Sequence, residues 1–409
     1  MERKRLGEAV DGALYAAGRL HLLLLRFLTG TLTLFLILVP VTGVWMVSLM
    51  RKYSVFRDFF GYLRRGQAIG SLAAFLLCYM GMFGALFWLC IVCRRLRIAK
   101  RLIVWSMIWV PFLNYGLALY VRGLARQEID HSIHKIRLDD VRVERQVCKT
   151  RYPVLLVHGV GFRDFHYFNY WGRIPRELRR NGAEVYYGHQ EAWGTVEDNG
   201  EILRQKIFEI LKETGAKKVN IIAHSKGGLD SRYLISGLVM GPYVATLTTI
   251  NTPHHGSALV DFLMGLPDGL YQLICRYIDW YFGKLGDKKP NAYAASRQLS
   301  CGYAKEFNEK YPDVPGVFYQ SFTSLMRHGL SSKLLCVPYW ILKVIDGPND
   351  GLVTAESARW TNFRGVVTNR YLRGISHGDM IDLTREDYRN FKVLEFYIQL
   401  VEKLAENGF

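Results

Sequence analysis

The hydrophobic pattern divides the chain near Val121. Before that point, three long apolar runs contain no charged residue, and basic clusters separate them. These runs cover residues 27–50, 69–93 and 102–121. About 20 apolar residues in a helix are enough to cross a bilayer. We therefore predict an all-α membrane region over residues 1–121, with about three transmembrane helices.

The third run is less regular than the first two, because it contains Pro111 and Asn114. It is compatible with a kinked span or with a helix lying at the membrane interface. From residue 122 to 149 the chain becomes polar and charged without a clear periodicity. We expect this stretch to be a linker.

After residue 150 short apolar runs alternate with amphipathic segments. The stretch 199–215 repeats its apolar residues at helical spacing and ends at Gly215, a suitable residue to end a helix. Continuous apolar strands alternating with helices are typical of a mostly parallel sheet covered on both faces. We predict this α/β architecture for residues 150–409. The predicted strands are 153–159, 183–188, 218–225, 244–253, 316–322 and 365–372.

The net charge of +17 is concentrated in the first part of the chain. Residues 1–149 hold 22 lysines and arginines against 9 acidic residues. Because these cations flank apolar runs, they indicate contact with membrane headgroups, and we do not expect nucleic-acid binding.

The basic loop 94–101 carries five positive charges and is expected on the cytoplasmic side. We therefore expect a multi-pass protein of the cell membrane. If all three runs span it, the domain over residues 150–409 lies on the extracytoplasmic side. The basic segment 51–65 argues against this orientation. Without the third span, the last domain is cytoplasmic.

The segment AHSKGG contains the candidate nucleophile, Ser225. It follows an apolar strand and matches the nucleophile elbow G-x-S-x-G, with Ala223 in place of the first glycine. Small flanking residues are needed because the serine occupies a strained turn. An ordinary turn with a capping serine is the alternative, and the preceding strand favours catalysis.

Two backbone amides are candidates for an oxyanion hole. One belongs to Lys226, the residue after the nucleophile. The other is expected in the loop after the first strand, where Gly159 and Gly161 flank Val160. A simple glycine-rich turn is the alternative for this loop.

The acid and the base are expected downstream of the serine, in that order. His377 follows the last predicted strand and is the candidate base, whereas His254 and His255 precede every good acid. Asp350, in a tight NDG turn, is the candidate acid, with Asp346 as the alternative.

The motifs PVLLVHGVGFRD, NIIAHSKGGLDSRY, TINTPHHGS, GVFYQSF, NDGLVTAESA and ISHGD occur in this order. Residues 150–409 thereby resemble the bacterial class 2 triacylglycerol lipases and related esterases of the α/β-hydrolase fold. The resemblance implies a triad of Ser225, Asp350 and His377, with Val160 and Lys226 as oxyanion amides. It also implies a carboxylic ester hydrolase.

Many secreted members of that family bind a structural calcium through an aspartate two residues after the catalytic histidine, a position that Asp379 matches. The second aspartate they use is missing from the stretch SFTSLMRHGLSSK. We therefore expect no calcium and no other cofactor.

The substrate is expected to be a lipid or another apolar ester. The segment 258–285 is rich in Leu, Phe, Tyr and Trp, and the resemblance implies a lid there, whereas two ordinary packed helices are the alternative. An acyltransferase using the same triad, or a membrane-bound binding module without activity, remains an alternative function.

Overall fold

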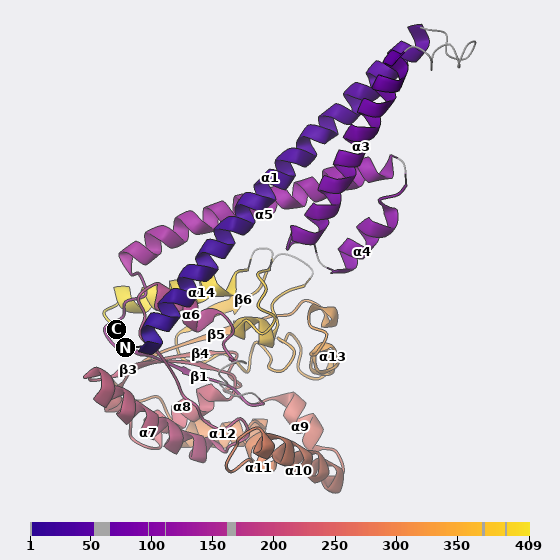
Figure 1. Ribbon diagram of the computed structural model, residues 1–409. Helices are drawn as coiled ribbons and strands as arrows, with labels where there is room; N and C mark the ends of the chain where they lie inside the picture. The colour runs from indigo at the N-terminus through magenta and orange to yellow at the C-terminus, as the bar shows by residue number, and fades with distance from the viewer. Residues whose placement is uncertain are drawn as a thin grey trace. The chain divides into compact units, whose positions relative to one another are not determined.

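The computed structural model describes residues 2–52, 66–96, 98–110, 112–161, 169–369, 373–388 and 391–409. The chain forms two compact units, Met1–Val141 and Arg142–Phe409. The first unit is helical, and the second contains the sheet (Figure 1).

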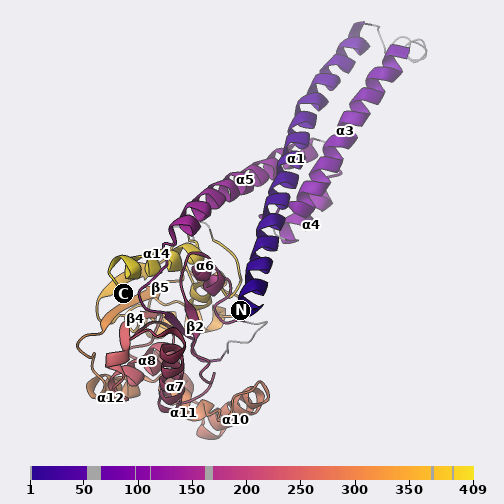
Figure 2. The same cartoon turned by 60° about the vertical axis from the view of Figure 1, so that its left-hand side comes forward.

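Two long helices of the first unit, α1 and α3, pack side by side (Figures 1 and 2). Leu36 and Leu86 belong to the core between the helices, whereas Ile37 and Leu77 are exposed. Within these helices, Ala16–Lys52 and Ile69–Val92 are long and apolar enough to cross a membrane. The helices of this unit that lie in the described residues are α1 (Glu2–Lys52), α3 (Gly66–Val92), α4 (Ile98–Met107) and α5 (Leu113–Arg145).

The third predicted span, residues 102–121, does not form one continuous helix. Its first part belongs to α4, which ends at Met107, and its second part belongs to α5, which begins at Leu113. The sequence between them contains Pro111, and a proline disfavours helical geometry in the residue before it. Helix α5 continues to Arg145 and so covers most of the predicted linker 122–149.

The second unit contains a parallel six-stranded sheet with the order β2-β1-β3-β4-β5-β6. Each observed strand lies in or overlaps one predicted apolar run, so the predicted sheet is confirmed. Residues 370–372 of the last predicted run lie outside the described residues. The strands are β1 (Val154–Val157), β2 (Val185–Tyr187), β3 (Val219–His224), β4 (Val244–Ile250), β5 (Phe318–Ser324) and β6 (Phe363–Val367).

Helix α7 (Val196–Thr214) confirms the predicted helix and shows why it begins and ends where it does. The Thr195 side chain accepts the N–H of Asp198 and caps the first turn. Gly215 ends the helix with φ = 69°, in the left-handed region that glycine adopts readily.

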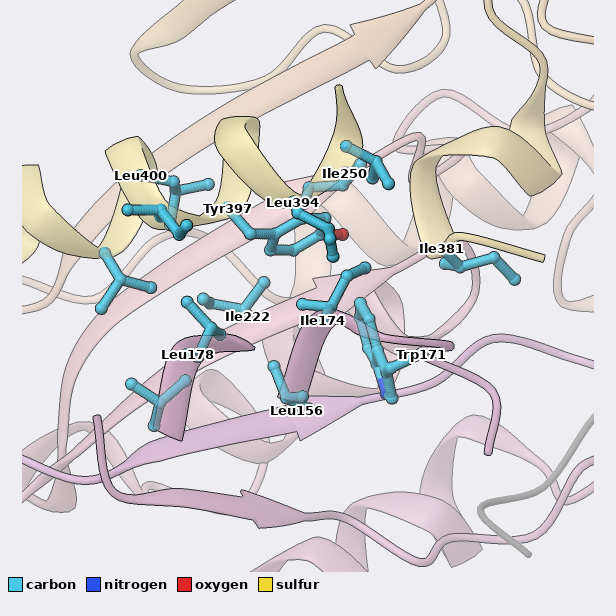
Figure 3. Close-up of a cluster of buried hydrophobic side chains, with 14 of the residues drawn as sticks. Leu156, Trp171, Ile174, Leu178, Ile222, Ile250, Ile381, Leu394, Tyr397 and Leu400 are labelled. Carbon is cyan, nitrogen blue, oxygen red and sulfur yellow. The ribbon is translucent and has the colours of Figure 1, made fainter. Parts of the chain in front are cut away.

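Side chains alternate between the two faces of the sheet and build two cores. Leu156 and Ile222 pack on one face against α6 (Ile174–Arg180) and α14 (Val393–Glu406). In Figure 3 the α14 residue Tyr397 lies in this cluster. On the other face, strand residues pack against α7 and α8 (Gly227–Ser236). The remaining α-helices are α9 (Ala258–Met264), α10 (Asp268–Lys284), α11 (Ala292–Arg297), α12 (Cys301–Lys310) and α13 (Cys336–Ile345).

The strand order determines where a site can form. From β1 the chain moves outward to β2 and then returns to the other side of β1 with β3. In parallel sheets the binding site forms at the carboxyl ends of the two strands between which the strand order reverses, and these strands are β1 and β3 here. Residues 158–161 and 225–226 follow these two strands.

Candidate active site

Ser225 lies on the sharp turn between β3 and α8. Its φ is 55°, in the left-handed region that side chains rarely adopt. The turn is held because the Ser225 N–H donates to the carbonyl of Ile250 at 2.9 Å, and the Gly228 N–H donates to the carbonyl of Ser225 at 3.0 Å. Such a strained strand-turn-helix exposes a nucleophile at the end of a sheet.

Two glycines allow the neighbouring backbones to approach this turn. A Cβ added to Gly159 would lie 2.7 Å from Cβ of Ser225. A Cβ added to Gly227 would lie 2.7 Å from the carbonyl oxygen of Val157. Both distances are too short for real carbon atoms, so these positions require glycine.

His377 and Asp350 form a buried pair. Nδ1 of His377 lies 2.7 Å from Oδ2 of Asp350, and the His377 backbone N–H donates to the Asp350 carbonyl at 2.8 Å. Oδ1 of Asp350 accepts the N–H groups of Leu352 and Val353 at 2.9 and 2.8 Å. Asp350 is therefore fixed as an acceptor on both oxygens, and it orients the imidazole through Nδ1.

The other candidate acids and bases have different surroundings. Oδ2 of Asp346 accepts the hydroxyl of Thr354 at 2.9 Å. His254 is buried, and its ring nitrogens lie near Thr249 and Arg232. Burial, and next the charge of Arg232, hold the pKa of His254 well below its usual value. The structure thus brings Asp350, and not Asp346, against His377.

His377 also stands beside the serine turn. Its ring centroid lies 4.5 Å from that of His224, the residue before Ser225. Burial, and next the neighbouring His377, hold the pKa of His224 well below its usual value. His224 is therefore a neutral neighbour of the candidate base. Ser225 and His377 are 8% and 6% exposed, so the site is nearly closed to solvent.

The two predicted oxyanion residues follow adjacent strands. β1 and β3 pair in register, with Val157 opposite Ala223, so Val160 and Lys226 come shortly after matched positions. The loop after β1 is tied down by the Gly161 N–H, which donates to the carbonyl of Ala192 at 3.2 Å.

The Lys226 side chain points into the protein, where Nζ lies 2.5 Å from Oδ1 of Asp230. Both side chains are buried. Burial raises the pKa of Asp230 to about 6, although Lys226 opposes the change. Oδ2 of Asp230 also accepts the amide of Asn199 at 3.0 Å. Since the ammonium is occupied, Lys226 can contribute to the site only through its backbone.

Sequence reasoning missed Tyr170, whose hydroxyl lies 2.7 Å from Nδ1 of His224. A Cβ added to Gly159 would lie 2.8 Å from the same hydroxyl, which places Tyr170 beside the serine turn. Tyr170 and His224 are 54 residues apart, and no motif connects them.

Within the described ranges, no group of three or more His, Cys, Asp or Glu residues could hold a metal ion. The seven cysteines all lie in those ranges and are all free, including Cys148, Cys275, Cys301 and Cys336 of the second unit.

Three features together define the α/β-hydrolase fold. They are a parallel sheet whose strand order reverses at β1 and β3, a serine on a strained turn at that point, and an Asp–His pair beside the serine. The N-terminal unit adds long apolar helices to this fold.

Comparison with known proteins agrees with this class. Residues 151–256 match the family model "Lipase (class 2)". A triacylglycerol lipase of Vibrio cholerae is 35% identical over 250 residues, which cover 54% of this chain and 78% of that protein. Triacylglycerol lipase 2 of Saccharomyces cerevisiae is 29% identical over 269 residues, covering 59% of this chain and 74% of the yeast protein.

Among solved structures, the mature lipase BlEst2 of Bacillus licheniformis is 23% identical, with a TM-score of 0.46, and the match covers 61% of this chain and 91% of that one. The sequence matches show that the chain belongs to the class 2 lipases. It is a carboxylic ester hydrolase.

Proposed function

We propose that this protein hydrolyses lipid esters at a membrane through a Ser225–His377–Asp350 triad. The observation that carries the proposal is the 2.7 Å contact between His377 Nδ1 and Asp350 Oδ2, beside a serine whose φ is 55°. Membership of the class 2 lipases supports the same reaction class.

The proposed reaction begins when His377 Nε2 takes the hydroxyl proton of Ser225. The serine oxygen bonds to the carbonyl carbon of the ester, and the carbonyl oxygen becomes an oxyanion. The backbone N–H groups of Val160 and Lys226 donate to this oxyanion. The carbon–oxygen bond of the ester then breaks, and the leaving alcohol takes the proton from His377.

Water completes the cycle by the same steps. His377 takes a proton from the water molecule, whose oxygen attacks the acyl carbon bound to Ser225. The serine leaves with the proton from His377, and the carboxylic acid is released. Throughout, Asp350 accepts the Nδ1–H of His377, which keeps Nε2 directed to the reacting atoms and stabilises the imidazolium.

An apolar surface on the second unit supports a lipid substrate. Helix α13 contacts α9, and α10 follows α9 after a sharp bend of 114° (Figure 1). Apolar patches of this kind mark contacts with other apolar material. We call this the α9–α10–α13 surface. Its large exposed side chains are Phe262, Leu263, Leu270, Leu273, Ile274, Tyr277, Trp280, Tyr281, Val337, Trp340, Val344 and Ile345.

The two helices that are long and apolar enough to cross a membrane support a multi-pass anchor. Their number also affects the side of the membrane on which the basic clusters place the hydrolase domain. With two crossings, Ala16–Lys52 and Ile69–Val92, the chain returns to the side where it started. The basic loop 94–101 follows directly and favours the cytoplasmic side. We infer that the hydrolase domain faces the cytoplasm. Three spans would place the domain on the extracytoplasmic side. Digestion of the domain by protease added to intact cells would show that location and contradict the cytoplasmic one.

The function is tested with a fluorophosphonate probe that reacts with activated serines. The parent should be labelled, and Ser225→Ala should not. Nitrophenyl esters of increasing chain length then test the substrate class. Activity confined to the acetate would leave an esterase and reject a lipase, and ester exchange in mixed water and alcohol would reveal an acyltransferase. No labelling of the folded parent would contradict the triad.

A further inference from the structure

Asp379 lies two residues after His377 and has both carboxylate oxygens occupied. Oδ2 accepts NH1 of Arg373 at 2.7 Å and the backbone N–H of Ser376 at 2.8 Å. Oδ1 accepts NH2 of Arg373 at 3.1 Å. This is a two-pronged arginine–carboxylate pair, the geometry in which a guanidinium binds a carboxylate best. The Asp379 side chain is 2% exposed and the Arg373 side chain 28%.

The residues present do not fit a calcium ion at this position. Calcium takes six to eight oxygen ligands, several from carboxylates. Here the matching carboxylate is already paired with a cation, and no group of three or more His, Cys, Asp or Glu side chains that could hold a metal occurs among the described residues. The guanidinium of Arg373 supplies the positive charge that a metal would bring.

The ion pair lies at the start of the segment that carries His377, residues 373–388, which we call the His377 segment. Asp379 and Ser376 form a reciprocal capping box at the N-terminus of the short helix His377–Ile381. His377 is the first residue of that helix, so the orientation of its backbone depends on this cap.

Arg373 is itself held in place. Its guanidinium carbon lies 3.6 Å from the ring centroid of Tyr388. Its carbonyl accepts the N–H of Arg327 at 3.3 Å and the hydroxyl of Ser331. The Ile375 N–H then donates to the carbonyl of Leu325 at 2.8 Å. These contacts attach the His377 segment to residues 325–331, which follow β5.

We propose that Arg373 is a positioning residue which takes the place of a structural metal and holds the His377 segment through Asp379. The hydrolase therefore works without calcium. The effect on catalysis rests on the proposed triad, whereas the effect on the segment does not.

The test compares Arg373→Ala and Arg373→Lys with the full-length parent in detergent, each with EDTA or with calcium chloride. Arg359→Ala is the matched control, because its ion pair with Glu356 is exposed. The measurements are kcat and KM on a soluble nitrophenyl ester, and hydrogen exchange of the amides in 373–388.

The parent and Arg359→Ala should be indifferent to EDTA and to calcium. In Arg373→Ala, kcat should fall about 10- to 100-fold, because small displacements of a catalytic group have effects of this size. KM should stay within about threefold, since substrate binding is not altered. Arg373→Lys should recover part of the kcat, and exchange in 373–388 should be fast in Arg373→Ala and slow in the parent.

Loss of parental activity in EDTA with recovery in calcium would overturn the proposal. So would slow exchange in 373–388 of a folded Arg373→Ala variant. If the parent hydrolyses no ester, the proposed function fails, and the exchange measurement still decides whether Arg373 holds the segment.

Discussion

The imidazole of His377 and the carboxylate of Asp350 meet at 2.7 Å although 27 residues separate them in the chain. A backbone hydrogen bond between the same two residues fixes their loops to each other. The pair is therefore held by a main-chain contact as well as by the side-chain contact, so the two side chains start from fixed backbone positions.

Asp350→Asn should lower kcat by about 10³- to 10⁴-fold while the protein stays folded, because an amide cannot hold the required imidazole tautomer. Asp346→Asn is the control, since Asp346 bonds to Thr354 and not to His377. Its kcat should stay near that of the parent. Steady-state hydrolysis of a nitrophenyl ester measures both, and equal losses would show that Asp350 has no special role.

Gly159→Ala should reduce the rate of probe labelling strongly. The added Cβ would meet Ser225 Cβ at 2.7 Å and the hydroxyl of Tyr170 at 2.8 Å, so the serine turn must shift. Gly269→Ala is the control, because nothing lies within 4 Å of its added Cβ. That change in helix α10 should stabilise the fold by up to about 1 kcal/mol. Labelling of Gly159→Ala at the parental rate would contradict this account of the turn.

Removing one partner of the buried Lys226–Asp230 pair should be costly. Asp230→Asn leaves the ammonium buried without its counter-ion, which should lower the free energy of unfolding by about 3–5 kcal/mol. The double variant Lys226→Met, Asp230→Asn removes the charge and should recover much of that loss. Thermal unfolding of the three proteins measures the difference, and a double variant as unstable as Asp230→Asn would rule out the unpaired charge as the cause.

Stability should fall in acid because of His224. Its pKa is lower in the folded than in the unfolded protein, so its contribution is complete above about pH 6.5, the ordinary value, and is lost as the pH falls toward the folded pKa. His224→Gln should therefore flatten the acid side of a plot of Tm against pH. His255→Gln, at an exposed histidine, is the control and should leave the slope as in the parent.

The α9–α10–α13 surface should matter for membrane-embedded substrate only. Trp340→Ser with Val344→Ser should lower hydrolysis of an ester dissolved in vesicles several-fold, because these side chains are 53% and 85% exposed and bury apolar area only at a lipid surface. Hydrolysis of a soluble short-chain ester should not change. Phe208→Ser, an exposed aromatic on α7, is the control. Equal loss on both substrates would mean that the surface serves the fold and not the lipid.

Much of the fold was predictable because its signals are local. Strands β1, β3 and β4 are buried along their whole length, so they appear in the sequence as largely apolar runs. The end of α7 was found from Gly215, because the preference of glycine for a positive φ is local and does not depend on tertiary contacts. The run 102–121, predicted as a kinked span or an interfacial helix, is divided between two helices, and hydropathy alone does not record that α4 ends at Met107 and α5 begins at Leu113.

The sequence by itself singled out Ser225 and His377 as candidates and gave the order expected for the acid and the base, because each stands in a short motif after a strand. It left Asp346 and Asp350 as alternatives, and only the tertiary structure brought one of them to His377. The same holds for Tyr170 beside His224 and for Arg373 on Asp379. These contacts depend on where each loop closes over the sheet, and that depends on the packing of the whole domain.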